Sequence, residues 1–109
     1  MLTNFFQGTT KEFSVTISFN GQAPDITSDT VSFLMKSEKS DADADAKISD
    51  TADVASQGSS GIALFSLASD DTGIDPGDYY WEILWTRASG KKYVLASEQI
   101  EVYERVFDV

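Results

Sequence analysis

Apolar and polar residues alternate with a period of two along most of the chain. The clearest example is Lys11–Phe19, where polar residues separate Phe13, Val15, Ile17 and Phe19. Successive residues of a β-strand face opposite sides of a sheet, so this segment is predicted to be a half-buried strand. Asn20-Gly21 follows directly and favours a tight hairpin turn.

The same alternation predicts further strands. In Tyr79–Thr86, which has the strongest pattern, the residues on one face are Tyr79, Trp81, Ile83 and Trp85. The other predicted strands are Thr30–Lys36, a weak strand within Ala46–Val54, Ile62–Leu67, Lys91–Ala96 and Gln99–Val106. Because no segment has a sustained period of 3.6, the only helical element expected is one 3₁₀ turn in the link Ala68–Asp78.

About seven short strands joined by Gly-containing turns predict an all-β fold, specifically a single antiparallel, immunoglobulin-like β-sandwich. A length of 109 residues fits one domain spanning residues 1–109. The strand parity also predicts the core, which consists of Phe13, Val15, Ile17, Phe33, Leu64, Trp81, Ile83 and Ile100.

The chain contains no histidine and no cysteine. A Ser-His-Asp or Cys-His nucleophile system is therefore impossible within it, and so are zinc sites built from these residues. We expect no catalytic residues, no cofactor and no metal, and we interpret the chain as a binding or building-block module.

The formal net charge is −10, and residues 41–75 carry most of it, with one base and eight acids. Such a chain is expected to be repelled by nucleic-acid phosphates and by anionic lipid. No apolar run approaches the roughly 18 residues that span a bilayer. The first residues lack the pattern of a secretory signal, so synthesis in the cytoplasm is expected.

One candidate cation site is the run Asp41-Ala42-Asp43-Ala44-Asp45. Alternating carboxylates resemble the start of a calcium loop, but Ala46 and Ala52 stand where an EF-hand has its glycine and its bidentate glutamate. Asp41, Asp43 and Asp45 form either a solvated acidic loop or a weak cation site.

Two other candidates come from the strands. Glu82 lies among aromatic residues and could belong to a pair of catalytic carboxylates, although its alternating neighbours indicate that it faces solvent or a cross-strand lysine. The aromatic residues Tyr79, Tyr80, Trp81, Trp85 and Tyr93 could stack on sugars. Core packing and a partner interface are the alternatives for this aromatic set.

The order of motifs resembles a known group of proteins. Phe6–Phe13 is similar to a Y/F-Q-G-D/T-T…F opening, and Val31–Lys36 to a V-x-F-x-x-K strand. Asp41–Ile48 is similar to its acidic extension, Leu67–Tyr80 to a corner ending in P-G-x-Y-Y, and Trp81–Val102 to the closing strands. This pattern resembles small Ig-like β-sandwich proteins of phage and prophage structural regions, including the N-terminal domain of siphophage baseplate upper proteins.

The resemblance implies a non-enzymatic structural or assembly protein of a phage or prophage particle, in the tail or baseplate region, that acts by protein–protein contacts. It would be a virion component, with other phage structural proteins as partners. A carbohydrate-binding or adhesion β-sandwich module is the alternative, and a carboxylate hydrolase is a third reading.

We also expect a homo-oligomer that associates through a sheet edge or an exposed aromatic patch. The segments Leu2–Phe6 and Tyr103–Val109 contain apolar residues that are expected to be exposed, namely Leu2, Phe5, Val106 and Phe107. Chain ends are rarely ordered unless something holds them. A partner could hold these ends, or they could pair with the chain's own sheet.

Overall fold

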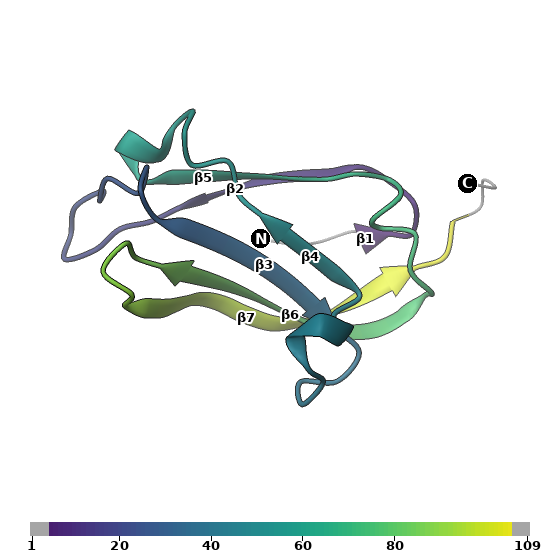
Figure 1. Cartoon of the computed structure of the whole chain (residues 1–109). Helices are drawn as coiled ribbons and strands as arrows, with labels where there is room; N and C mark the ends of the chain where they lie inside the picture. The colour runs from purple at the N-terminus through teal and green to yellow at the C-terminus, as the bar shows by residue number, and fades with distance from the viewer. Residues whose placement is uncertain (1–4, 106–109) are drawn as a thin grey trace.

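The computed structural model describes residues 5–105, which form two β-sheets around a shared core (Figure 1). The larger sheet contains, in spatial order, β1 (Phe5–Phe6), β7 (Lys92–Tyr103), β6 (Gly77–Thr86), β3 (Thr30–Lys36) and β4 (Ile48–Thr51). The smaller sheet pairs β2 (Lys11–Thr16) with β5 (Ile62–Leu67). Two short 3₁₀ helices, η1 (Asp43–Asp45) and η2 (Gly58–Ser60), lie in loops. The prediction of an all-β fold is confirmed.

The larger sheet is mixed. Its pairings are antiparallel except at one edge, where β1 runs parallel to β7 with Phe5 opposite Val102. A purely antiparallel arrangement is therefore wrong at β1. This strand was not predicted because two residues are too few to show a period.

The predicted strands Lys91–Ala96 and Gln99–Val106 are one continuous strand, β7. A register shift opposite Ile83 and Leu84 places Tyr93 against Trp85 and Ala96 against Ile83. Such a bulge inserts one extra residue, so the inward-facing parity changes from odd to even along β7. The predicted gap between the two strands is absent, because Ser97 pairs with Glu82 and Glu98 with Trp81.

The chain crosses from one sheet to the other immediately after β4. Ala52 N donates to the carbonyl of Val31 in the large sheet at 2.8 Å. Asp53 N donates to the carbonyl of Leu64 at 2.8 Å, and Leu64 N returns a bond to Asp53 at 3.0 Å. This segment joins the two sheets along one side of the core.

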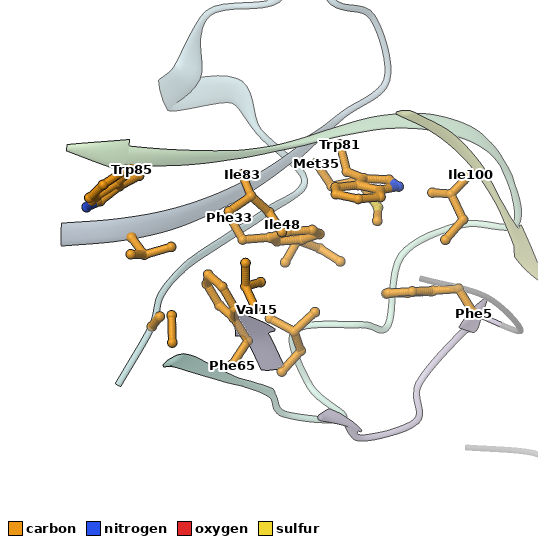
Figure 2. Close-up of a cluster of buried hydrophobic side chains, with 14 of the residues drawn as sticks. Phe5, Val15, Phe33, Met35, Ile48, Phe65, Trp81, Ile83, Trp85 and Ile100 are labelled. Carbon is orange, nitrogen blue, oxygen red and sulfur yellow. The ribbon is translucent and has the colours of Figure 1, made fainter. Parts of the chain in front are cut away.

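Buried apolar side chains from both sheets fill the space between them (Figure 2). Phe33 lies at the centre, with its ring centroid 6.0 Å from that of Trp81 and 6.1 Å from that of Phe65. Of the predicted core, Val15, Ile17, Phe33, Trp81, Ile83 and Ile100 are buried. Phe13 is half-buried and stacks on Phe65 at 5.0 Å, so it covers the edge of the core.

The prediction that Leu64 belongs to the core is wrong. The buried face of β5 consists of Ala63, Phe65 and Leu67, and Leu64 is half-buried on the opposite face. Ile62–Leu67 is an almost continuous apolar run, so its sequence gives no alternation from which to choose the inward face. The choice is made by packing across the small sheet, where Ala63 pairs with Val15 and Phe65 with Phe13 on the face that lines the core.

The predicted turns are present at two hairpins. Asn20 and Gly21 have φ angles of 54° and 78°, and Phe19 and Gln22 exchange backbone hydrogen bonds across them. Arg87 and Gly90 close the β6–β7 hairpin. The link Ala68–Asp78 is a hydrogen-bonded turn without a 3₁₀ helix. Thr72 holds it by donating its hydroxyl to the carbonyl of Thr9 at 2.6 Å.

Phe5 is only 1% exposed and packs in the core, so the expectation that it is exposed is wrong. The cause is the pairing of β1 with β7, which directs Phe5 inward and Phe6 outward. The expectations for Leu2, Val106 and Phe107 concern positions outside the described residues.

Candidate functional site

The five-stranded sheet has a second face, directed away from β2 and β5, which we call the outer face. A hollow of about 550 Å³ lies on it, between the strands and the loop Ser37–Lys47. Its floor is formed by β3 and β6 residues of the outward parity. In Figure 1 the loop with η1 projects from the sheet on the side away from β2 and β5. Lys39, Asp43 and Ala44 of this loop line the hollow.

The centre of the outer face is apolar. Leu34 and Leu84 are half-buried on neighbouring strands, and Val94 is 57% exposed directly opposite Leu84. Leu34 lies diagonally across from Leu84, because Leu34 pairs with Glu82, and such diagonal neighbours are within contact range of long side chains. An outward sheet face in water is ordinarily polar, so this group forms an apolar patch across three strands.

Tyr80 and Lys39 occupy one end of the hollow. The Lys39 ammonium lies 5.3 Å from the centroid of the Tyr80 ring, which is a cation–π distance. Lys39 makes no ion pair with residues 5–105. This lysine therefore presents a positive charge at the rim of the hollow.

The acidic loop is held by Lys36. Its ammonium donates to Asp43 Oδ1 at 2.7 Å and to the carbonyl of Asp41 at 2.9 Å. Asp41 Oδ2 accepts from the backbone N of Glu38 at 3.2 Å, while Asp45 is exposed in η1. The structure does not gather Asp41, Asp43 and Asp45 around one point, and residues 5–105 contain no group of three or more acids placed to hold a metal ion.

Glu82 is exposed and lines the hollow, so the expectation that it faces solvent is confirmed. Its cross-strand neighbours are Leu34 and Ser97. Neither of these side chains can serve as the second carboxylate that acid–base hydrolysis of a glycoside needs.

The aromatic set is divided between core and surface. Tyr79, Trp81 and Trp85 are buried, which confirms core packing for them. Tyr93 is half-buried and contacts Trp85 at 5.1 Å between ring centroids. Tyr80 is left as the member that faces the outer hollow.

A second aromatic pair lies at the β1 edge of the sheet. Phe6 and Tyr103 are opposite each other in the parallel ladder, their ring centroids are 5.7 Å apart, and both are more than 40% exposed. This pair could not be predicted from the sequence, because β1 is too short to be recognised from its pattern.

The surroundings of Asp50 raise the pKa of its carboxyl group. Burial raises the pKa of Asp50, and the nearby negative charge of Asp71 raises it further, against the effect of a backbone hydrogen bond from Thr51. Asp50 lies on the edge strand β4 opposite the core residue Phe33, which explains its partial loss of solvent. Asp50 lies on the edge strand β4 and Asp71 lies in a loop, and neither lines the hollow. Their repulsion therefore affects the stability of the fold and not the hollow.

Comparisons with known proteins identify no relative. No family model, no curated protein and no solved structure matches the chain. Among the described residues no helix is long and apolar enough to cross a membrane.

Proposed function

We propose that this chain is a non-enzymatic structural or assembly module that acts by protein–protein contact. The observation that carries the proposal is the outer face, where Leu34, Leu84 and Val94 form an apolar centre. Serines, lysines and acids surround this centre and the hollow beside it. An apolar centre with a polar rim is the usual anatomy of a protein interface.

The setting we propose is a phage or prophage particle, in the tail or baseplate region. The support for this step is the similarity of the motif order between Phe6 and Val102 to structural proteins of such particles. Within that setting we propose an Ig-like sandwich. Tyr79 supports it, since its hydroxyl donates to the carbonyl of Asp75 at 2.6 Å, four residues upstream near the start of a strand. This contact resembles the tyrosine corner of Ig-like domains.

The second candidate is a carbohydrate-binding module, and Tyr80 is the residue that favours it. Its ring faces the hollow together with Ser32, Ser49 and Glu82, which offers both stacking and hydrogen bonding. Lys39 lies over this ring, so a sugar would have to displace the ammonium group.

Binding to the tail and baseplate proteins encoded beside its gene tests the proposal. Purified chain should bind at least one of them in calorimetry, and Leu84→Glu should weaken that binding at least about tenfold. Ser14→Glu is the matched control, because Ser14 is exposed on the far side of the small sheet. The proposal fails if none of these proteins binds. Binding to a glycan array that Tyr80→Ala abolishes would support the carbohydrate alternative.

A further inference from the structure

One edge of β7 is open along most of its length. The strand pairs with β6 on one side throughout, whereas on its other side β1 pairs with it only at Val102 and Tyr103. No other strand among residues 5–105 pairs with that side. The segment Lys92–Glu101 therefore presents an unpaired edge, which we call the β7 edge, and such an edge is a template for a further strand.

Two hydrogen bonds show which backbone groups point to the β7 edge. The carbonyl of Tyr103 accepts from Gln7 N at 3.0 Å, so the backbone groups of Tyr103 point toward β1. The carbonyl of Lys91 accepts from Arg87 N at 2.8 Å, so it points toward the β6 side. The direction alternates along a strand, and the bulge at Leu95 shifts the alternation by one residue. The residues whose N–H and C=O groups point to the open edge are therefore Lys92, Val94, Ser97, Gln99 and Glu101, and all of them are exposed.

We propose that the β7 edge pairs antiparallel with the same edge of a second copy, across a two-fold axis perpendicular to the sheet. This inference goes beyond the proposed function, since it concerns the edge of the sheet and not its outer face. With the axis midway between Lys92 and Glu101, Lys92 of each copy lies opposite Glu101 of the other, and Val94 lies opposite Gln99. Each pair joins residues with open backbone groups, so the two strands can exchange hydrogen bonds. The same edge serves both copies, as in isologous dimers.

The charges of the β7 edge are complementary to themselves in this register. Lys92 and Glu101 have no ion-pair partner within the described part of the chain. Glu101 lies directly opposite Asp78 of β6, and like charges in this position are destabilising. Lys92 of the second copy lies on the other side of Glu101 and relieves that repulsion. The axis makes the contact twice, which opposes the long-range repulsion between two chains of net charge −10.

The bulge of β7 makes the side chains match in this register. Tyr93 lies opposite Trp85, and Ile100 lies opposite Tyr79, so both face the core although one position is odd and the other even. Ile100 of one copy therefore lies opposite Tyr93 of the other on the same face. On the outer side Val94, which is 57% exposed, gains the stem of Gln99 as a neighbour. A bulge commonly guards an edge against pairing, but here it lies next to the axis and interrupts the ladder only at its centre.

A charge swap on the full chain tests the ionic part of the proposal. Sedimentation equilibrium should show a dimer, and Lys92→Glu or Glu101→Lys should each raise its dissociation constant at least about tenfold. The double variant Lys92→Glu/Glu101→Lys restores opposite charges across the axis and should recover most of the loss. Lys47→Glu and Glu38→Lys make the same charge changes at exposed positions beside β3 and β4, and they should have little effect.

The backbone part has a test of its own. Gln99→Pro removes an N–H that points to the open edge, so it should abolish the dimer while circular dichroism shows an intact fold. Gln99→Ala keeps the N–H and should leave most of the affinity. In amide hydrogen exchange, Val94, Gln99 and Glu101 should become protected as the concentration of the chain rises.

Two results would overturn the proposal: a monomer at all concentrations, or a dimer that neither charge swap nor Gln99→Pro weakens. If a monomeric chain binds a co-encoded tail protein, the proposed function stands and the self-association is wrong. If a dimer with these properties binds no such protein, the edge pairing stands and the proposed function is wrong.

Discussion

The indole Nε1 of Trp85 donates a hydrogen bond of 2.9 Å to Asp29 Oδ2, across 56 residues of chain. The other carboxylate oxygen accepts from the backbone N of Ala88 at 2.9 Å, in the β6–β7 hairpin. Arg87 completes the group, with its Nε 3.6 Å from Asp29 and its guanidinium 4.9 Å from the Trp85 ring centroid. One nearly buried carboxylate therefore ties the start of β3 to the β6–β7 hairpin at one end of the core.

Replacing Asp29 tests how much these interactions contribute to the free energy of unfolding. Asp29→Ala leaves the Trp85 indole and the Ala88 amide without their acceptor, so we expect a loss of roughly 1–3 kcal/mol in the free energy of unfolding. Urea titration measures it. Asp25→Ala is the control, because Asp25 is exposed and accepts hydrogen bonds only from Thr27. Equal costs for the two variants would contradict the structural role of Asp29.

A comparison of Ile17, in the core directly after β2, with Leu64, on the outward face of β5, provides a second test. Ile17 is 3% exposed, so Ile17→Ala should destabilise the fold by roughly 2–5 kcal/mol. Leu64→Ala removes a side chain of similar size from the outward face of β5 and should cost clearly less. Thermal and urea unfolding give both values. A cost below about 0.5 kcal/mol for Ile17, the usual surface range, would mean that its side chain is not in the core.

The contrast between Ile17 and Leu64 shows what the sequence could and could not predict. In Tyr79–Thr86 a large apolar or aromatic residue stands at every second position, and the inward face was correct at every position. In Ile62–Leu67 almost every residue is apolar, so the inward face depends on which side chains fit against β2. That fit is a property of two strands together and is not visible in either strand alone.

The predictions missed β1 and divided β7 into two strands for a related reason. β1 and the bulge of β7 are defined by pairing between residues far apart in the sequence, as Phe5 with Val102. Local periodicity carries no information about such pairs. The outer face could be predicted in part, because the alternation in β3 and β6 already placed Leu34 and Leu84 on the side away from the core. Val94 lies on the hairpin side of the bulge and joins them because it pairs with Leu84.

The acidic loop should not bind calcium tightly. The Lys36 ammonium contacts Asp43 Oδ1 and the carbonyl of Asp41, so a cation would have to replace it there. The loop also lacks the glycine and bidentate glutamate of a calcium cage. Titration calorimetry should detect no binding with a dissociation constant of about 10 μM or tighter. Tight binding that Asp43→Asn removes would contradict the solvated-loop interpretation.

Asp50 should make stability depend on pH. Its pKa in the folded chain is raised by burial and by Asp71 above the ordinary value of about 3.9. The folded state thus holds this proton more tightly than the unfolded chain does. The contribution to stability is full below the unfolded pKa and is lost as pH rises through the folded pKa.

Asp50→Asn should therefore stabilise the fold at pH 7. Because the group is partly solvated, we expect a gain of no more than about 0.5 kcal/mol. The gain should disappear below about pH 3.5, where the unfolded carboxyl also binds its proton. Urea titrations of both proteins across this range provide the measurement, and Asp45→Asn in the exposed helix η1 is the control. A gain that persists unchanged at low pH would exclude ionisation as its cause.

The two tryptophans of β6 form a matched pair for the last prediction. Trp81 and Trp85 lie on the same face of the strand and are 2% and 1% exposed. Trp85 Nε1 bonds to Asp29, whereas Trp81 Nε1 is buried and has no hydrogen-bond partner. In Figure 2 the Trp81 nitrogen points toward Ile100, an apolar neighbour. Replacement by phenylalanine removes part of a large ring at both sites, so the cost of the lost packing is similar.

The polar contribution should then differ between the two variants. Trp85→Phe leaves a nearly buried carboxylate without one of its donors, while Trp81→Phe removes a donor that was already unsatisfied. We expect Trp85→Phe to be the more destabilising by roughly 1–3 kcal/mol in urea unfolding. In the Asp29→Ala background the carboxylate is absent, so the difference should shrink toward zero, as a double-mutant cycle requires for a direct interaction. A difference that survives in that background would show that packing, rather than the bond to Asp29, distinguishes the two tryptophans.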